Sequence, residues 1–197
     1  VDDHLVSPDR LNSNNNHSSE NIDFHQLDKQ GMISVFPHYR LDTDWPHPIL
    51  GLAFSDGKNT TYLSYEELIY HKSALDLCTN NNQLISYDVK SLLHAQTDEF
   101  KVNPIIWDMM ILAFDLDSNL NTYQKIAEVY QWPSYPVAKI DEENTGLARQ
   151  IALKMHETFF KIKESLEKEN LLDVYTQIDY PLVQVLYEME KDGIRVN

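Results

Sequence analysis

The stretch IDYPLVQVLYEMEKDGIRVN, residues 178–197, decides how the rest of the chain is interpreted. Its apolar residues recur at steps of three and four positions, which predicts a helix with one apolar face. Pro181 suits the first turn of that helix, with Asp179 or Tyr180 as the capping residue. Gly193 is expected to end it. The apolar face consists of Leu182, Val185, Leu186 and Met189.

The residues after Gly193 alternate as in a strand, just before the sequence ends. Ile194 and Val196 are apolar, and Arg195 between them is charged. A strand needs a partner that satisfies its backbone groups, so a chain seldom stops at such a place. We therefore expect this sequence to be part of a longer protein.

Residues 178–196 follow the order hydrophobic-acidic-x-Pro-Leu-Val-x-x-Leu-x-x-Met-Glu-x-x-Gly-Ile-x-Val. This pattern closely resembles a segment of bacterial DNA polymerase I, a family A polymerase, that leads from the 3′–5′ exonuclease-like domain into the polymerase domain. The resemblance covers roughly residues 31–197 and implies a ribonuclease-H-like α/β fold, a mixed β-sheet flanked by helices. It implies an exonuclease-like domain at residues 31–177, a connecting helix at residues 178–197, and a polymerase domain outside this chain.

Residues 1–30 are expected to form a flexible polar linker. The run NSNNNHSSE, residues 12–20, is a low-complexity segment that buries too little apolar surface to offset its chain entropy. In the family that the C-terminal pattern resembles, a linker at this place would follow the 5′-nuclease domain.

The rest of the chain reads as strands interspersed with helices, an order typical of an α/β protein with a mixed sheet. The Asp56–Gly57 turn predicts a hairpin, and Ser64 with Glu67 forms a capping box for the next helix. The expected strands are Met32–Phe36, Pro48–Ser55, Asn59–Leu63, Leu84–Tyr87 and Ile105–Trp107. The expected helices are Ser64–Cys78, Val89–Ala95, Asp108–Phe114, Tyr123–Trp132 and Glu142–Glu169.

The composition indicates a folded, acidic protein. With 42% hydrophobic and 11% aromatic residues, the chain is too apolar for a disordered protein. A formal net charge of −15 repels the phosphate backbone, so we expect little or no DNA binding by this chain alone. Cys78 is the only cysteine, which fits a reducing cytoplasm. No apolar run approaches the roughly 20 residues that cross a membrane, so no membrane contact is expected.

An active exonuclease of this family needs carboxylates from three motifs to hold two divalent metal ions. The Asp-x-Glu motif falls on Pro37–Tyr39, whose proline and tyrosine do not usefully bind a hard cation. In the second motif Asp88 stands at an asparagine position and Leu92 at the aspartate position. The third motif, Tyr-x-x-x-Asp, finds neither residue type in residues 146–152. The resemblance therefore implies no catalytic residue, no metal ligand and no cofactor in this chain.

The resemblance implies a fragment of a DNA-directed DNA polymerase, in which a vestigial, inactive exonuclease-like domain supports the polymerase domain. The parent enzyme would be a cytoplasmic nucleotidyltransferase of DNA replication and repair, with Mg²⁺ in its polymerase domain. The expected partner of this chain is the polymerase domain of the same protein. The resemblance implies that the apolar face of Leu182, Val185, Leu186 and Met189 packs between the two domains. DNA would be reached through the parent enzyme.

Two other functions remain open. Asp42 and Asp44 would be a displaced Asp-x-Glu and, with Asp88 and Asp108, would form the rearranged acidic cluster of an active metal-dependent 3′–5′ exonuclease. Against this, Asp42 and Asp44 lie just before Trp45 and are expected in a loop, where acidic residues are usually solvated. The second alternative is an acidic protein-interaction module that recruits a basic replication or repair partner.

Overall fold

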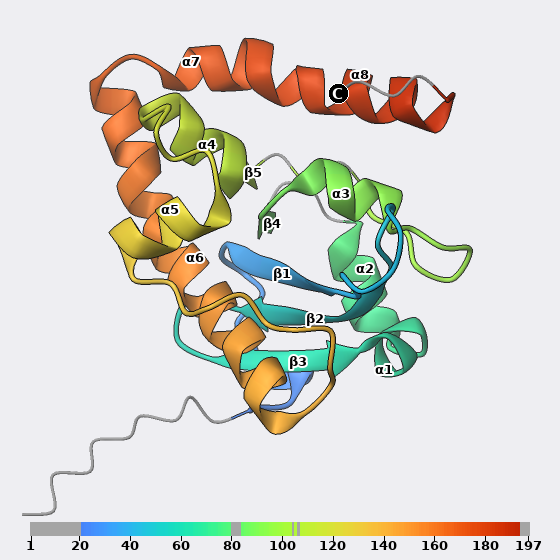
Figure 1. Ribbon diagram of the computed structural model, residues 1–197. Coiled ribbons are helices and arrows are strands. Elements are labelled where there is room, and N and C mark those ends of the chain that lie inside the picture. The colour runs from blue at the N-terminus through green and yellow to red at the C-terminus, as the bar shows by residue number, and fades with distance from the viewer. Residues whose placement is uncertain (1–20, 80–83, 104, 106, 194–197) are drawn as a thin grey trace, which may run out of the picture.

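The middle of the fold is a strand, β1 (Ile33–Tyr39), that is buried along its whole length. The other strands are β2 (Ile49–Ser55), β3 (Thr60–Ser64), β4 (Leu84–Ser86) and β5 (Trp107–Asp108). The computed structural model describes residues 21–79, 84–103, 105 and 107–193, and its sheet has the order β3-β2-β1-β4-β5 (Figure 1). β2 is antiparallel to β1 and β3, whereas β4 and β5 run parallel to β1. The predicted mixed sheet is confirmed.

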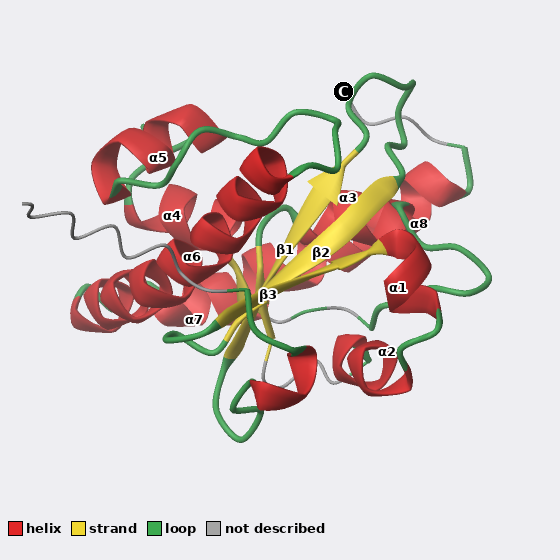
Figure 2. Ribbon diagram, turned by 90° about the horizontal axis from the view of Figure 1, so that it is seen from below, coloured by secondary structure: helices red, strands yellow, loops and turns green. Residues whose placement is uncertain are grey.

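Helices cover both faces of this sheet (Figures 1 and 2). They are α1 (Tyr65–Ile69), α2 (Lys72–Cys78), α3 (Val89–His94), α4 (Met109–Leu116), α5 (Tyr123–Tyr130), α6 (Glu142–Lys168), α7 (Leu172–Val174) and α8 (Tyr180–Lys191). Because side chains alternate along a strand, Phe36 packs with α4, α5 and α6, while Val35 packs with α1, α2 and α3. Among the described residues, no helix has both the length and the apolar character needed to span a membrane.

β1 is longer than predicted, because Pro37 does not end it. Pro37 lies opposite Leu52 of β2, and the strand continues to Tyr39. The pairing of β1 with β4 is confined to Ile33 and Ser34, so a residue without a backbone N–H interrupts no bond to β4 at position 37. The positions where a metal-binding Asp-x-Glu was sought therefore lie inside the buried strand.

The helix predicted from Ser64 to Cys78 is two helices. The capping box of Ser64 and Glu67 is present and begins α1 as predicted. His71 then begins α2, because its Nδ1 accepts a hydrogen bond from the backbone N–H of Ala74 at 3.2 Å. This second start could not be predicted from the residues alone, since histidine is an uncommon capping residue.

The segment expected to be a linker contributes to the core at its end. Phe24, in a 3₁₀-helix at Phe24–Gln26, is 1% exposed, and Leu27 is 5% exposed. The backbone N–H of Ile22 donates to Thr60 O at 3.2 Å, at the edge of the sheet. The polar run at residues 12–20 and the expected strand at residues 194–196 lie outside the described residues.

The C-terminal helix begins earlier than predicted. A π-helical turn, Tyr175–Asp179, joins α7 to α8, so Asp179 has helical backbone angles and its side chain caps nothing. Pro181 lies in the first turn of α8, as predicted, and Gly193 follows the helix with a φ of +100°. This helical segment leaves the end of α6 and crosses above α4 and α3 (Figure 1).

Candidate functional site

β1 and β4 are parallel, so their carboxyl ends meet at one edge of the sheet, the usual place for a site in such folds. The pairing of β1 with β2 shifts by one residue between His38 and Tyr39, a bulge of the kind that redirects side chains near sites. A cavity of about 100 Å³ lies at this edge. It is lined by Tyr39, Leu41, Trp45, His47, Tyr87, Asp88, Ser91 and Tyr135.

Tyr39 is the last residue of the stretch Pro37–Tyr39, on which the Asp-x-Glu motif falls, and it is 6% exposed. Its hydroxyl is buried and has no hydrogen-bond partner among the described residues. Burial raises the pKa of Tyr39 well above its ordinary value, and the nearby carboxyl of Asp88 raises it further. Burial likewise raises the pKa of Tyr87 and of Tyr135. These phenols are therefore neutral at pH 7 and offer no anionic oxygen to a hard cation.

His38 lies on the opposite face of β1 and is used structurally. Its Nε2 is 2.6 Å from the carbonyl oxygen of Val137, which can only accept, so Nε2 carries the proton. Its Nδ1 then accepts from the hydroxyl of Tyr62 at 2.8 Å. Burial lowers the pKa of His38, which keeps the ring neutral. Both ring nitrogens are occupied, so neither is free for a metal ion.

Asp88 follows β4 and is committed to the first turn of α3. It has a left-handed backbone, with a φ of 54°. Its Oδ1 accepts from the backbone N–H of Ser91 at 3.3 Å, and its Oδ2 accepts from the Ser91 hydroxyl at 2.6 Å. Leu92, at the position where the second motif needs aspartate, is 1% exposed and packs in the core.

Asp108 lies at the end of β5, fully buried, and holds together the starts of α3 and α4. Its carboxylate accepts backbone N–H groups from Asp88 at 3.0 Å, Val89 at 2.9 Å and Met110 at 3.0 Å. Its own N–H donates to the Tyr175 hydroxyl at 2.9 Å. Burial raises the pKa of Asp108 to about 7, against the lowering effect of the three N–H donors. Asp108 therefore occupies a structural position.

The rearranged acidic cluster is not assembled. Asp42 and Asp44 are exposed in the loop between β1 and β2, and Asp42 lies 3.4 Å from the Nε of Arg40. Only Asp88 and Asp108 are neighbours, through the backbone N–H of Asp88. Within the described part of the chain, no three His, Cys, Asp or Glu side chains are grouped so as to hold a metal ion.

Glu190, the glutamate of the Met-Glu-x-x-Gly pattern, joins α8 to α3. Its Oε1 accepts from Lys90 Nζ at 2.8 Å and its Oε2 lies 2.8 Å from His94 Nε2. The hydrogen bond from Lys90 holds the pKa of Glu190 below its ordinary value. The His94 ring lies edge-on to Trp45 at 4.6 Å and to Tyr187 at 4.8 Å. Because Trp45 lines the small cavity, this contact connects α8 to the candidate site.

Only part of the face that was expected to pack between domains is exposed to solvent. Leu182 is 47% exposed and Val185 is 49% exposed, while Leu186 and Met189 are half-buried. The residue of α8 that reaches the core is Val183, at 7% exposure. The predicted face thus remains accessible along one side of α8.

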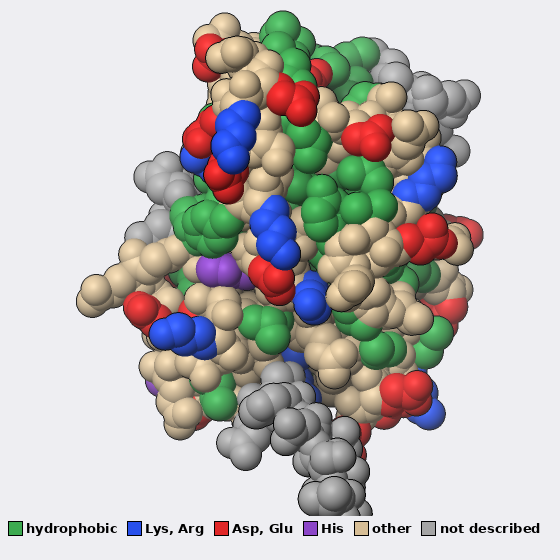
Figure 3. Space-filling model, turned by 90° about the vertical axis from the view of Figure 1, so that its left-hand side faces the viewer, with side chains coloured by type: hydrophobic (Ala, Val, Ile, Leu, Met, Phe, Trp, Pro, Cys, Tyr) green, Lys and Arg blue, Asp and Glu red, His purple; other side chains and the backbone are tan. Residues whose placement is uncertain are grey.

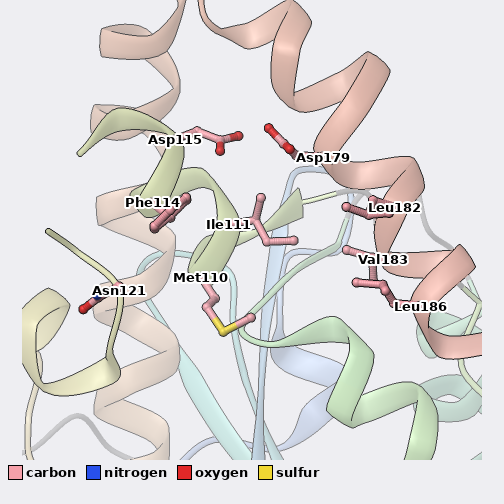
Figure 4. Close-up of a pocket in the computed structure, with 9 residues that line it drawn as sticks. All are labelled: Met110, Ile111, Phe114, Asp115, Asn121, Asp179, Leu182, Val183 and Leu186. Atoms are coloured by element: carbon pink, nitrogen blue, oxygen red, sulfur yellow. The ribbon is translucent and has the colours of Figure 1, made fainter. Parts of the chain in front are cut away.

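Asp115 of α4 and Asp179 point toward each other beside this face (Figure 4). Burial raises the pKa of Asp115 to about 7, and the nearby Asp179 carboxylate raises it further. This pair could not be predicted from the sequence, because the two residues are distant along the chain and neither belongs to a motif.

Asp115→Asn is expected to gain stability over the wild-type protein as pH rises. In the unfolded chain Asp115 loses its proton near pH 4, whereas the folded protein keeps it until about pH 7. The stability that this bound proton contributes is present below pH 4 and is lost as pH rises through 7. Asparagine has no such titration, so the advantage should be small at about pH 4 and about 1 kcal/mol at about pH 8, given solvent screening.

Urea unfolding of both proteins at the two pH values measures this difference. Asp173→Asn, at an exposed position of α7, is the matched control and should show no such pH dependence. An advantage of equal size at both pH values would contradict the assignment.

No family model matches the chain. It is 27% identical over 174 residues to DNA polymerase I of Helicobacter pylori, a match that covers 80% of this chain and 20% of that protein. It is 21% identical over 145 residues to DNA polymerase I of Caldicellulosiruptor bescii, which covers 73% of this chain and 16% of that protein. The chain therefore spans at most about a fifth of these curated relatives.

Solved structures share its fold. The POL domain of Pol1 from M. smegmatis, in complex with DNA primer-template and dNTP, has a TM-score of 0.65 at 14% identity, over 84% of this chain and 29% of that one. Brucella melitensis NrnC has a TM-score of 0.63 at 14% identity, over 88% of this chain and 90% of that one. Both expectations are confirmed: the chain is similar in sequence to bacterial DNA polymerase I, and it has a ribonuclease-H-like α/β fold.

Proposed function

We propose that this chain is part of a DNA polymerase I, in which an exonuclease-like domain has lost its nuclease activity and supports the polymerase domain. The observation that carries the proposal is the edge of the sheet where metal ligands would have to stand. Tyr39 and Leu92 occupy two of those positions, and their side chains bind no Mg²⁺. The Asp88 carboxylate accepts hydrogen bonds from the backbone N–H and the hydroxyl of Ser91. Two metal ions need several carboxylates, both as ligands and to offset their charge.

The surface supports a role that does not depend on gripping DNA. Along α6 the lysines are paired with glutamates one turn away, as in Lys161 with Glu157 and Lys168 with Glu164. Figure 3 shows blue and red side chains interleaved on one face of the molecule, without a continuous basic surface. With a net charge of −15, contact with DNA would come through the polymerase domain and its Mg²⁺.

The supporting role is assigned to α8. Glu190 and Val183 hold this helix against the domain, and Leu182 with Val185 remains exposed on its other side. A helix fixed on one side and apolar on the other is suited to hold a following domain in a defined orientation. Replication and repair, and a cytoplasmic location, belong to the same proposal.

The test is a nuclease assay on the purified chain. A 5′-labelled single-stranded oligonucleotide is incubated at high protein concentration, first with Mg²⁺ and then with Mn²⁺, beside an active 3′–5′ exonuclease as positive control. We expect no metal-dependent shortening, and no difference between the wild-type chain and Asp42→Asn or Asp88→Asn. Shortening that either substitution abolishes would contradict the proposal and support the rearranged acidic cluster.

A further inference from the structure

A groove separates α4 from α8 and has a volume of about 360 Å³ (Figure 4). Its size lies in the range of roughly 300–1,000 Å³ that is usual for ligand pockets. The walls are apolar apart from Asn121 and the two acids Asp115 and Asp179. The apolar side chains that line it are Met110, Ile111, Phe114, Leu182, Val183 and Leu186.

The rim of the groove exposes large apolar side chains. Among the residues that line the groove, Phe114 is 49% exposed and Leu182 is 47% exposed. Ile178, four positions before Leu182 in the sequence, is 61% exposed. Val185, on the next turn of α8, is 49% exposed. A contiguous exposed apolar surface around a groove is typical of a protein interaction site. The chemistry of the occupant is set by what lies within the groove.

The acid pair marks the place of a positive charge. While Asp115 keeps its proton, it shares a hydrogen bond with Asp179; once both groups are ionised, neither can donate a hydrogen bond to the other. No lysine or arginine in the described part of the chain forms an ion pair with either carboxylate. Two facing carboxylates repel each other, and a cation between them would relieve that repulsion.

We propose that this groove receives an amphipathic helix of a partner protein, whose apolar stripe carries one lysine or arginine that lies between Asp115 and Asp179. The apolar walls accept the stripe as in other helix-in-groove complexes, and the acid pair selects the cation. Which protein supplies this helix depends on the proposed function, in which α8 faces the polymerase domain. The chemistry of the groove does not depend on it.

Other occupants fit less well. Nucleic acid would bring phosphates to an acidic groove on a chain of net charge −15. A second copy of the chain, in a symmetric pair, would place its own Asp115 and Asp179 against the same face and add to the repulsion. A basic protein helix offers both the apolar surface and the charge that the groove lacks.

The test uses the whole chain and three labelled helical peptides of about 16 residues, a length at which isolated helices become stable. The peptides share a leucine stripe and differ at one central position, which is lysine, norleucine or glutamate. Fluorescence anisotropy is expected to show the lysine peptide binding roughly tenfold tighter than the norleucine peptide, and the glutamate peptide weakest. Leu182→Glu should abolish binding of all three peptides.

Substitutions of the two aspartates test whether their charges select the lysine peptide. Asp115→Asn and Asp179→Asn should each remove the preference for lysine and leave the affinity of the norleucine peptide nearly unchanged. Asp173→Asn, on the exposed side of α7, should preserve the preference. Circular dichroism confirms that each variant is folded.

Three results would overturn the proposal. They are equal binding of the lysine and norleucine peptides, no binding of any peptide, or a concentration-dependent dimer in sedimentation that Leu182→Glu dissolves. The last result would assign the groove to a second copy. Metal-dependent DNA shortening would contradict the proposed function and leave the peptide result intact, so the two failures are distinguishable.

Discussion

Asp108→Ala is expected to lower the free energy of unfolding by roughly 3 kcal/mol. The carboxylate is fully buried and accepts the backbone N–H groups of Asp88, Val89 and Met110. Alanine leaves these three donors without a partner, at a cost of roughly 1–3 kcal/mol for each one that water cannot reach. Part of the loss is offset, because the buried carboxylate no longer has to be desolvated.

The size of this loss should depend on pH. Burial raises the pKa of Asp108 to about 7, above the value of about 4 in an unfolded chain. The folded protein therefore holds a proton between these values that the unfolded chain has released. The stability that this bound proton contributes is fully present below pH 4 and is lost as pH rises through 7. Asp108→Ala should consequently cost more near pH 5 than near pH 8.

Urea unfolding followed by circular dichroism measures both effects. Asp44→Ala, at an exposed loop position, is the matched control and should change stability by no more than about 0.5 kcal/mol. Asp108→Asn keeps one acceptor oxygen and should fall between the two. If Asp108→Ala is as mild as Asp44→Ala, the carboxylate does not hold the starts of α3 and α4 together.

The order of strands and helices was predictable because its signals are local. The Asp56–Gly57 turn and the Ser64–Glu67 capping box depend on residues a few positions apart, and both are confirmed. The continuation of β1 through Pro37 depends on where the pairing with β4 stops. That boundary is a property of the whole sheet, and no residue near Pro37 signals it.

In the candidate site too, the features that depend on nearby residues were predictable, and those that depend on distant residues were not. The sequence indicated that Tyr39 and Leu92 stand where carboxylates were sought, and the structure places Tyr39 in the cavity and Leu92 in the core. No pattern in the sequence indicates that Tyr135 lies beside Tyr39, which is nearly a hundred residues away along the chain. The Met-Glu-x-x-Gly pattern identified Glu190 as part of a resemblance, and only the fold reveals its contact with α3.

Glu190→Ala is expected to weaken the attachment of α8 to the domain by roughly 2 kcal/mol, about the value of one or two hydrogen bonds to a charged group. The glutamate side chain is 7% exposed, whereas Lys90 is 30% exposed and can regain water when its partner is lost. The cost is therefore smaller than for a fully buried ion pair. It should fall on α8 and leave the sheet unaffected.

Hydrogen exchange separates this local effect from global unfolding. In Glu190→Ala the amides of α8 should exchange about 30-fold faster, the equivalent of roughly 2 kcal/mol, while those of β1 keep their protection. Glu188→Ala is the matched control, since Glu188 is exposed on the same helix and its side chain accepts a hydrogen bond from Gln184 of that helix at 2.8 Å. If α8 exchanges as slowly as before, Val183 and Tyr187 hold it without the charge pair. If α8 and β1 lose protection together, the helix is part of the cooperative core, and an orientation set by α8 would then be as rigid as the sheet itself.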